Sequence, residues 1–206
     1  MCYLKAYMSE NYQSSTPSRG AALGSLVFEV IKVAVISLAI IVPVRYFLIQ
    51  PFYVKGESME PNFYDHEYLI IDELSYRVRE PERGEIVVFK YPLDPKQFFI
   101  KRIIGLPGER VTIRDDQVYI SKNGSEPKLL NETYLPADRR TELALHGFGD
   151  VTLGDNQYFL LGDNREQSKD SRTFGPVNKD FIIGRTWIRG WPIERLTVFN
   201  DPDYNF

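Results

Sequence analysis

The sequence predicts a mainly β protein that carries one N-terminal transmembrane helix. One strongly apolar segment runs from Leu26 to Ile49, and after Gln50 the chain becomes a series of short apolar runs separated by Pro, Gly and Asn turns. Thirteen Tyr and thirteen Phe among 206 residues favour strands as well, because aromatic side chains are enriched there. We therefore expect a single N-terminal helix followed along the chain by a coiled antiparallel sheet or a barrel-like domain.

The N-terminal 25 residues have the composition of a disordered tail. Residues 9–20 are rich in Ser, Asn, Gln, Pro and Gly and show no apolar period. Residues 26–50 then form the predicted anchor, since a helix of this length spans about 36 Å and crosses a bilayer core. Lys5 and Arg19 precede the anchor, which places residues 1–25 in the cytoplasm.

Three other interpretations of the apolar segment stay open. A cleaved secretory signal would be followed by a small-x-small site, but Gln50-Pro51-Phe52-Tyr53 follows here. An amphipathic surface helix would need one polar face, whereas Val33–Val44 is apolar all round apart from Ser37. A buried core helix is the third alternative, because the uninterrupted apolar core is only ~12 residues long.

Residues 51–206 read as one extracytoplasmic β domain. Residues 114–156 look like an irregular polar insertion on it, in which Asp115-Asp116 forms a hairpin tip. The predicted strands are Tyr68–Ile71, Ile86–Tyr91, Phe98–Ile104, Val111–Ile113, Val118–Ile120, Gln157–Leu161, Phe181–Ile188 and Leu196–Phe199.

Composition excludes several kinds of partner and cofactor. The net charge of −3 argues against nucleic acid, because phosphate binding needs a basic patch. Cys2 is the single cysteine, so the chain has neither a disulfide framework nor a cysteine zinc site. His66 and His146 are isolated, and we therefore expect no metal and no cofactor.

Ser58 is a candidate nucleophile. It lies where an extended segment, Phe52–Val54, gives way to a turn that Gly56 permits and that Pro61 keeps from becoming helical. A serine on such a turn presents its hydroxyl to a cleft and its own backbone N–H to a developing oxyanion. The alternative is an ordinary surface serine.

Lys101 is a candidate general base for that serine. In a strand it shares a face with Phe99, and aromatic surroundings lower the pKa of a lysine by excluding water. A neutral lysine can accept the proton of a serine hydroxyl without any histidine. The alternative is an exposed lysine on a strand face.

A dense polar stretch, residues 162–175, follows the apolar run Gln157–Leu161. Within it Asp163 and Asp170 can bracket Arg172 in an ion-pair cluster, and Ser168 can donate or accept a hydrogen bond with a lysine amine. A solvated surface loop is the competing interpretation.

Four motifs together resemble the bacterial type I signal peptidases, over about residues 50–192. They are GESMEP at residues 56–61, RGEIVVF at 83–89, KRIIGLPGE at 101–109 and GDNREQSKDSRTFG at 162–175. The resemblance implies a membrane-bound serine endopeptidase that removes signal peptides from exported preproteins through an acyl-enzyme. Its expected location is the bacterial plasma membrane, single-pass, with the N-terminus cytoplasmic and the catalytic domain on the outer face.

The resemblance also assigns roles to residues. Ser58 attacks the scissile carbonyl, Lys101 takes its proton, and Ser168 orients the lysine amine. Asp163, Asp170 and Arg172 brace the site, with Arg102 as a further member of that cluster. The substrate is a preprotein signal peptide with small residues at −1 and −3, added as a β-strand. The residues expected around its two shallow pockets are Phe52, Val54, Met59, Leu69, Phe99 and Ile100.

The lipid bilayer is the second expected partner. Phe47, Phe52 and Tyr53 are candidates for the lipid interface, which would hold Ser58 near the membrane surface.

Three positions depart from the family pattern. Asn62 stands where Thr is usual, Gln167 where Asn is common, and Gly56 where some members carry a Ser that completes the oxyanion hole. A backbone group or water must then supply the second oxyanion donor.

Three rival functions stay open at this point. The first is a serine hydrolase that uses His66 with Asp65 or Asp72. The second is a self-cleaving repressor-type Ser/Lys protease, which would carry a DNA-binding domain in place of the anchor. The third is a membrane-tethered, catalytically inactive β scaffold of the same fold.

Overall fold

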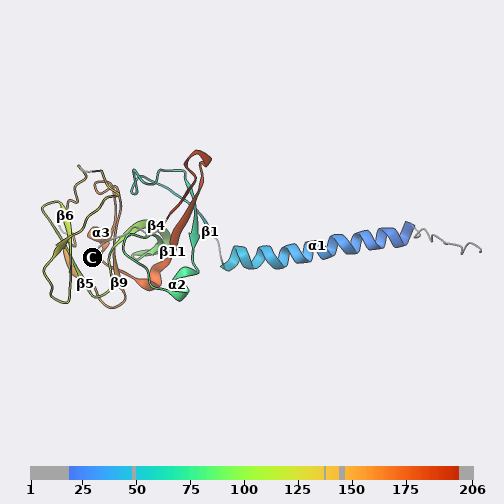
Figure 1. The fold of residues 1–206 in the computed structure, drawn as a ribbon, viewed down its shortest axis with the longest axis horizontal. Helices are drawn as coiled ribbons and strands as arrows, with labels where there is room; N and C mark the ends of the chain where they lie inside the picture. Colours follow the sequence, from blue (N-terminus) through green and yellow to red (C-terminus); the bar gives the residue numbers. More distant parts are fainter. Residues whose placement is uncertain (1–18, 48–49, 137, 144–146, 200–206) are drawn as a thin grey trace, which may run out of the picture. The chain divides into compact units, whose positions relative to one another are not determined.

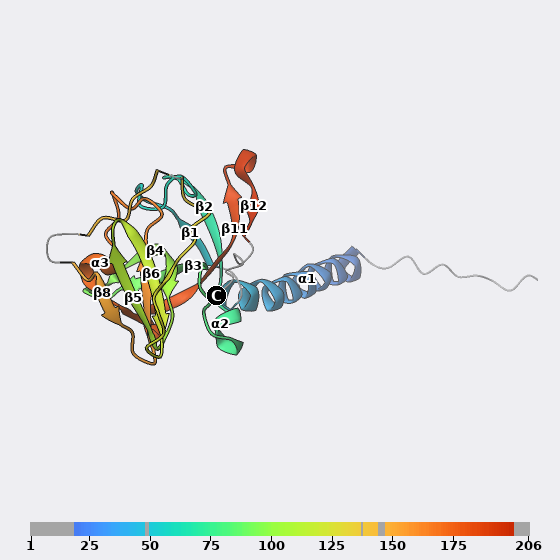
Figure 2. The same cartoon turned by 60° about the vertical axis from the view of Figure 1, so that its left-hand side comes forward.

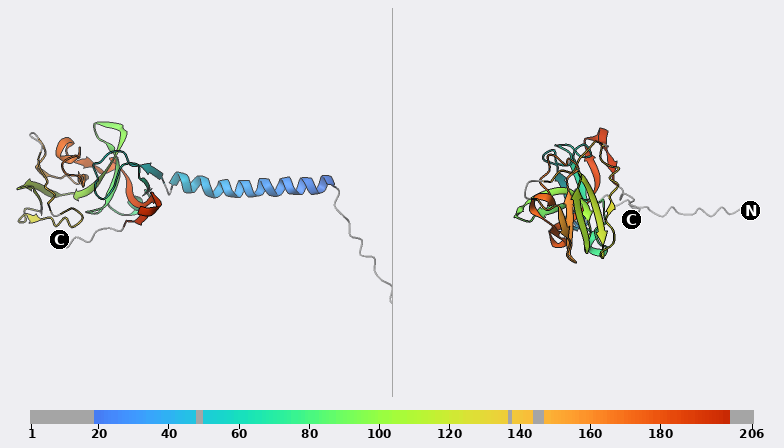
Figure 3. Two further views of the ribbon diagram at one scale, coloured as in Figure 1. Left: turned by 90° about the horizontal axis from the view of Figure 1, so that it is seen from above. Right: turned by 90° about the vertical axis from the view of Figure 1, so that its left-hand side faces the viewer.

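The computed structural model describes residues 19–47, 50–136, 138–143 and 147–199, and the chain divides into two compact units, residues 1–43 and 44–206. Helix α1 (Arg19–Phe47) is a single long helix, seen lengthwise in Figure 3. It begins seven residues before the start of the predicted anchor, so residues 19–25 are helical. Residues 1–18 of that tail, and residues 48–49 of the anchor, lie outside the described residues.

The large apolar side chains of α1 between Leu26 and Val42 are exposed, at 48–68 % of their full area. Among the helices in the described ranges, none combines the length and the mean hydropathy that crossing a bilayer requires.

The second unit is built on a large antiparallel sheet. Its order is β1-β2-β11-β3-β4-β9-β10, with β12 paired to β11. The strands are β1 (Gln50–Tyr53), β2 (Tyr68–Asp72), β3 (Ile86–Tyr91), β4 (Asp94–Gly105), β9 (Gln157–Leu161), β10 (Val177–Asn178), β11 (Ile182–Trp191) and β12 (Thr197–Val198).

A separate four-stranded sheet lies at the other end of this unit from β1 and β11 (Figures 1 and 2). It contains β7 (Lys128–Leu129), β6 (Gln117–Lys122), β5 (Glu109–Arg114) and β8 (Asp150–Thr152), in that order. The predicted irregular insertion, residues 114–156, is therefore partly a regular sheet, because it contains β6, β7 and β8: β7 pairs with β6, and β8 pairs with β5. Asp115 and Asp116 do form the hairpin tip, both with positive φ (51° and 60°), as a type I′ turn requires.

The predicted fold class, mainly antiparallel β with few helices, is confirmed. After α1 the described helices are short: α2 (Ser75–Val78), α3 (Ser171–Phe174) and the 3-10 turns η1 (Lys179–Phe181) and η2 (Ile193–Arg195). All eight predicted strands are present, and β3 and β9 match their predicted ends. The short strands β1, β7, β8 and β10 were not among the eight.

Three buried apolar clusters hold the second unit together. One packs Ile104, Phe159 and Leu161 under the small sheet, and another packs Val87, Phe89 and Leu160 between β3 and β9. The third contains Val54, Met59 and Leu69, which fix the turn after β1 to the large sheet.

The large sheet curls so that β1 and the first half of β4 approach each other. The rings of Phe52 on β1 and Phe98 on β4 lie 5.7 Å apart, although three strands separate β1 from β4 in the sheet order. Within the described ranges, strand β1 pairs with β2 alone, and β9 pairs with β4 only at residues 102–105. Two strand edges therefore face one another across a gap.

Candidate active site

Ser58 lies on the turn that follows β1. Gly56 in this turn has φ +95°, a left-handed conformation that a side chain would strain, and its N–H donates to Asp65 Oδ1 at 2.9 Å. Met59 is 1 % exposed in the core beside Val54, which anchors the turn from below. The half-buried Ser58 side chain is consequently held at the sheet surface. The Gly56 N–H is already engaged, so it is not the missing oxyanion donor.

Lys101 comes to this serine from the middle of β4. Its amine donates to Ser58 Oγ at 2.7 Å and to the carbonyl oxygen of Ile100 at 2.8 Å. The lysine is 3 % exposed, and its Nζ lies 5.5 Å from the centre of the Phe99 ring. The structure thus brings together two residues that are 43 positions apart in the sequence.

Burial lowers the pKa of Lys101. Loss of water lowers the pKa of Lys101 from 10.5 to about 8, against the opposing effect of the Asp170 and Asp163 carboxylates and with a smaller contribution from Arg172. Within the described residues no carboxylate pairs with the amine directly. At pH 7 a group with this pKa is uncharged in roughly one molecule in ten.

Ser168 lies beside the turn after β1 that carries Gly56, Ser58 and Met59, called the nucleophile turn below. An added Cβ at Gly162 would fall 2.1 Å from Ser168 Oγ and 2.5 Å from the carbonyl oxygen of Ser58, so only glycine fits between them. The Ser168 hydroxyl is buried and forms no hydrogen bond with any residue in the described part of the chain. The predicted bond from Ser168 to the Lys101 amine is therefore not formed here, and the orienting role stays a prediction.

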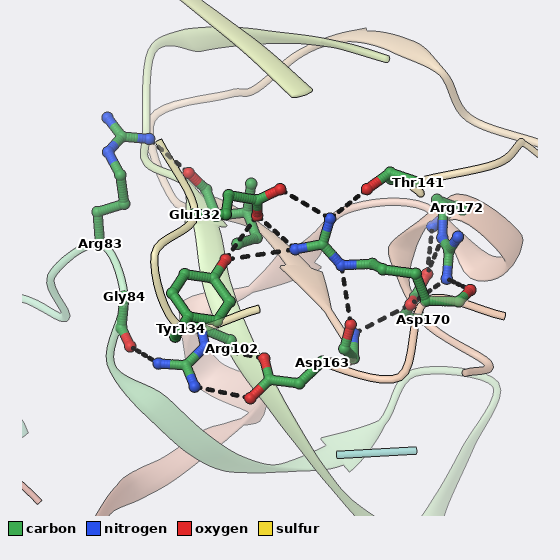
Figure 4. A network of polar contacts seen from close by, with 12 residues as sticks. Arg83, Gly84, Arg102, Glu132, Tyr134, Thr141, Asp163, Asp170 and Arg172 are labelled. Carbon is green, nitrogen blue, oxygen red and sulfur yellow. Dashed lines mark hydrogen bonds and ion pairs between the residues drawn. The ribbon is translucent and has the colours of Figure 1, made fainter. Parts of the chain in front are cut away.

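Asp163 pairs with Arg102, not with Arg172 as the sequence suggested (Figure 4). Arg102 Nε and Nη2 donate to the two Asp163 oxygens at 2.8 and 2.7 Å, and Arg102 Nη1 donates to the Gly84 carbonyl at 2.9 Å. Asn62 Nδ2 also donates to Asp163, at 2.8 Å. The Asn that departs from the family pattern thus binds this buried carboxylate.

Asp170 and Arg172 form a second pair. Arg172 Nε and Nη2 donate to Asp170 at 2.9 and 2.8 Å, and Asp170 also accepts from the Gly162 N–H at 3.0 Å. Asp170 is 0 % exposed. The predicted single cluster is therefore two neighbouring ion pairs: Arg102 on β4 pairs with Asp163 on the loop after β9, and Arg172 in α3 pairs with Asp170 at the start of that helix.

Arg165 is a site-bracing residue that the sequence did not single out. Its side chain is fully buried; it donates to the Gly162 carbonyl at 3.0 Å, to both Glu132 oxygens and to Thr141 Oγ1. Glu132 and Thr141 lie between β7 and β8, so this segment holds the loop after β9 (Figure 4). The one indication in the sequence was that Arg165 lies within the GDNR motif.

A cleft of about 520 Å³ opens beside Ser58 and Lys101 between β1 and β4. Five of the six residues predicted for the substrate pockets line it: Phe52, Val54, Leu69, Phe99 and Ile100. Met59, the sixth, does not line it, because its side chain points into the core below. Polar side chains also line the cleft, among them Lys55, Glu57, Gln97, Gln167 and Lys169.

His66 does not take part in this geometry. Its side chain is 75 % exposed, its Nδ1 lies 2.9 Å from Asp65, and it does not line the cleft. Asp72 is bound to Ser75 and Arg185. The arrangement favours Lys101 over His66 as the partner of Ser58.

Comparison with known proteins agrees with the motifs. The family model described as signal peptidase, peptidase S26, matches residues 27–191. The chain belongs to this family. It is 41 % identical over 176 residues to a probable signal peptidase I-2 from Synechocystis, covering 82 % of this chain and 76 % of that protein.

Two further relatives are signal peptidases I. Identity to signal peptidase I P of Bacillus subtilis subsp. natto is 34 % over 178 residues, which is 84 % of this chain and 93 % of the relative. A crystal structure of a signal peptidase I from Enterococcus faecalis aligns with 52 % of this chain and 97 % of its own, at 33 % identity and a TM-score of 0.43.

Proposed function

We propose that this chain is a membrane-bound serine endopeptidase that removes N-terminal signal peptides from exported preproteins. The observation that carries the proposal is the 2.7 Å contact between a buried lysine amine, freed of any carboxylate partner in the described chain, and a serine hydroxyl at the wall of a cleft. Membership of the signal peptidase family supplies the substrate class.

The reaction follows from these two groups. Neutral Lys101 accepts the Ser58 proton while Ser58 Oγ attacks the scissile carbonyl, and the ammonium then protonates the leaving amine. Water, deprotonated by the same lysine, releases the acyl group. The Ser58 N–H stabilises the oxyanion, and Asp163, Asp170 and Arg172 brace the surrounding loops.

The substrate lies in the cleft as an added strand. The facing edges of β1 and β4 offer unpaired backbone groups to an extended segment, which supports strand addition. Apolar side chains line the cleft, among them Val54, Leu69 and Ile100, and they suit small residues at −1 and −3 of the signal peptide.

The bilayer is the second proposed partner. In our proposal residues 26–50 anchor the enzyme in the bacterial plasma membrane, with the N-terminus in the cytoplasm and the catalytic domain outside. The exposed apolar side chains of α1 support this, as do Trp191 and Ile193 at the β11–β12 tip, 53 and 65 % exposed. The protein should stay with membranes after alkaline carbonate extraction; release into the supernatant would remove the anchor from the proposal.

The decisive experiment is cleavage of a purified preprotein with Ala at −1 and −3, in detergent. Wild type should cut at that site, whereas folded Ser58→Ala and Lys101→Ala should not. Lys90→Ala, which removes an exposed lysine on neighbouring β3, is the matched control and should cut normally. A well-folded wild type that cuts none of a panel of preproteins would favour the inactive scaffold instead.

A further inference from the structure

Asn164 holds two consecutive carbonyl groups of the nucleophile turn. Its backbone N–H donates to the backbone carbonyl oxygen of Ser58, and its side-chain Nδ2 donates to the backbone carbonyl oxygen of Glu57, each at 3.1 Å. Asn164 is 8 % exposed and lies on the loop after β9, 106 positions from Ser58. It contacts the nucleophile turn without lining the cleft.

The orientation of the Asn164 amide is fixed by its partners. Arg139 Nη1 donates to Asn164 Oδ1 at 3.1 Å. A guanidinium can only donate and a peptide carbonyl can only accept, so Oδ1 must face Arg139 and Nδ2 must face Glu57. Arg139 lies between β7 and β8, so this segment also reaches the nucleophile turn.

The Glu57 carbonyl and the Ser58 N–H belong to one peptide group. Because the peptide is planar and trans, its C=O and N–H point in opposite directions, and fixing the carbonyl fixes the direction of the N–H. The cis bonds of the described chain are at Glu60-Pro61 and Trp191-Pro192, not here. No described residue accepts a hydrogen bond from the Ser58 N–H, which leaves it directed away from Asn164.

We propose that Asn164, oriented by Arg139, is a positioning residue that directs the Ser58 N–H toward the oxyanion of the acylation step. The proposal rests on the proposed function, because an oxyanion forms only if Ser58 attacks a carbonyl. Asn164 acts through the Glu57–Ser58 peptide and touches neither the substrate nor Lys101. A simple loop tether would instead affect stability and leave the chemical step alone.

Four variants separate these roles. Asn164→Ala removes the donor, and Asn164→Asp keeps the shape but places an acceptor against the Glu57 carbonyl. Arg139→Ala leaves the donor in place without its orienting partner. Asn131→Asp makes the same chemical change at an exposed site and is the matched control. For each we would measure kcat, KM, the pH profile and hydrogen exchange at the Glu60 amide.

Losing one oxyanion donor lowers kcat by about 10²–10³-fold, so we expect the kcat of Asn164→Asp to fall about 100-fold with KM changed less than about twofold. The kcat of Asn164→Ala should fall about tenfold, because the Glu60 N–H still donates to the Glu57 carbonyl oxygen at 3.1 Å. The kcat of Arg139→Ala should fall less than that of Asn164→Ala, and the kcat of Asn131→Asp should match wild type. The apparent pKa in the Asn164→Ala profile should stay at the wild-type value. Exchange at Glu60, whose N–H shares the Glu57 oxygen with Asn164, should accelerate in both Asn164 variants.

Four outcomes would overturn the proposal: an unchanged kcat in folded Asn164→Asp, a loss confined to KM, unchanged exchange at Glu60, or a shifted pKa in Asn164→Ala. The shifted pKa would mean that the effect acts through Lys101. If wild type cuts no preprotein, the proposed function fails by itself. Exchange at Glu60 then decides separately whether Asn164 orients this peptide.

Discussion

Lys101 and Arg102 are adjacent on β4 and equally buried, at 3 % and 5 % exposure, yet their surroundings are opposite. Arg102 forms two hydrogen bonds with the Asp163 carboxylate. Among the described residues, the Lys101 amine is hydrogen-bonded to a hydroxyl and a carbonyl but to no carboxylate, because Asp163 and Asp170 are occupied by Arg102 and Arg172. Burial therefore favours the neutral form only where the counter-charge has been taken by another cation.

The comparison extends to the two regions around these residues. The bracing network, formed by the Arg102–Asp163, Arg172–Asp170 and Arg165–Glu132 pairs, satisfies its buried charges internally. In the cleft beside it, the Lys101 amine has no carboxylate partner among the described residues. The network thus has two effects, since it fixes the loops and also withholds carboxylates from Lys101.

Replacing Lys101 by arginine, the residue type of its neighbour Arg102, should lower kcat more than any other change considered below. Lys101→Arg puts a permanently charged group where the base must be neutral. Losing a catalytic base of this kind lowers kcat by roughly 10⁴-fold or more. Single-turnover cleavage with folded protein would measure the loss, and a decrease of less than tenfold would show that Lys101 is not the base.

Breaking the network should mainly lower stability. Asp163→Asn leaves Arg102 buried without its counter-charge, and breaking such a pair lowers the free energy of unfolding by about 3–5 kcal/mol. Urea unfolding would measure it. Asp150→Asn removes an exposed partner of Arg110 and serves as the control, with no expected change in midpoint. Equal midpoints for both variants would contradict the contrast drawn here.

Removing the unpaired amine should raise stability. Lowering the pKa of Lys101 from 10.5 to about 8 on folding reduces the free energy of unfolding by about 3 kcal/mol at pH 7. Lys101→Met should raise the free energy of unfolding by about that much. The unfolded lysine keeps its proton up to 10.5 while the folded one releases it above 8, so wild-type stability rises with pH in this window. The advantage of Lys101→Met should therefore shrink between pH 8 and 10.5, and an advantage that stays constant there would argue against a lowered pKa.

The pH dependence of cleavage should be the smallest of these effects. Below its pKa of about 8 Lys101 is mostly protonated, so kcat/KM should rise about tenfold per pH unit and level off above about pH 9. Initial rates between pH 6 and 10 would measure it, with circular dichroism at each pH as the control. A flat profile under conditions limited by chemistry would rule out a neutral-lysine mechanism.

The sequence predicted the strands with strong apolar periods and missed those without them. Strands β3 and β9 have their predicted ends because their burial is nearly continuous. The start of β4 was missed because Asp94–Gln97 is polar and contains Pro95, which an edge position tolerates. Strands β7, β8 and β10 have two or three residues each, too few for any period to show.

For the site, local sequence motifs predicted that Ser58 and Lys101 would lie together, but they did not predict every ion-pair partner. Ser58 and Lys101 each lie in a distinctive motif. Asp163 was matched to Arg172 because the two are near in sequence, whereas its true partner Arg102 is 61 positions away. The role of Arg165 depends on Glu132, which comes from a segment with no pattern of its own. Long-range ion pairs of this kind are set by the curl of the sheet, which single-sequence patterns do not record.

The facing edges of β1 and β4 also set a conformational condition on anything that enters between them. A segment paired on both sides has no backbone groups left for a helix or hairpin of its own. Each helical turn near the cut must therefore unwind first, and a helix-favouring or already folded region opposes binding by its own stability. In the proposed mode of binding the gap therefore selects by folding state: an extended chain can bind, and a folded one cannot.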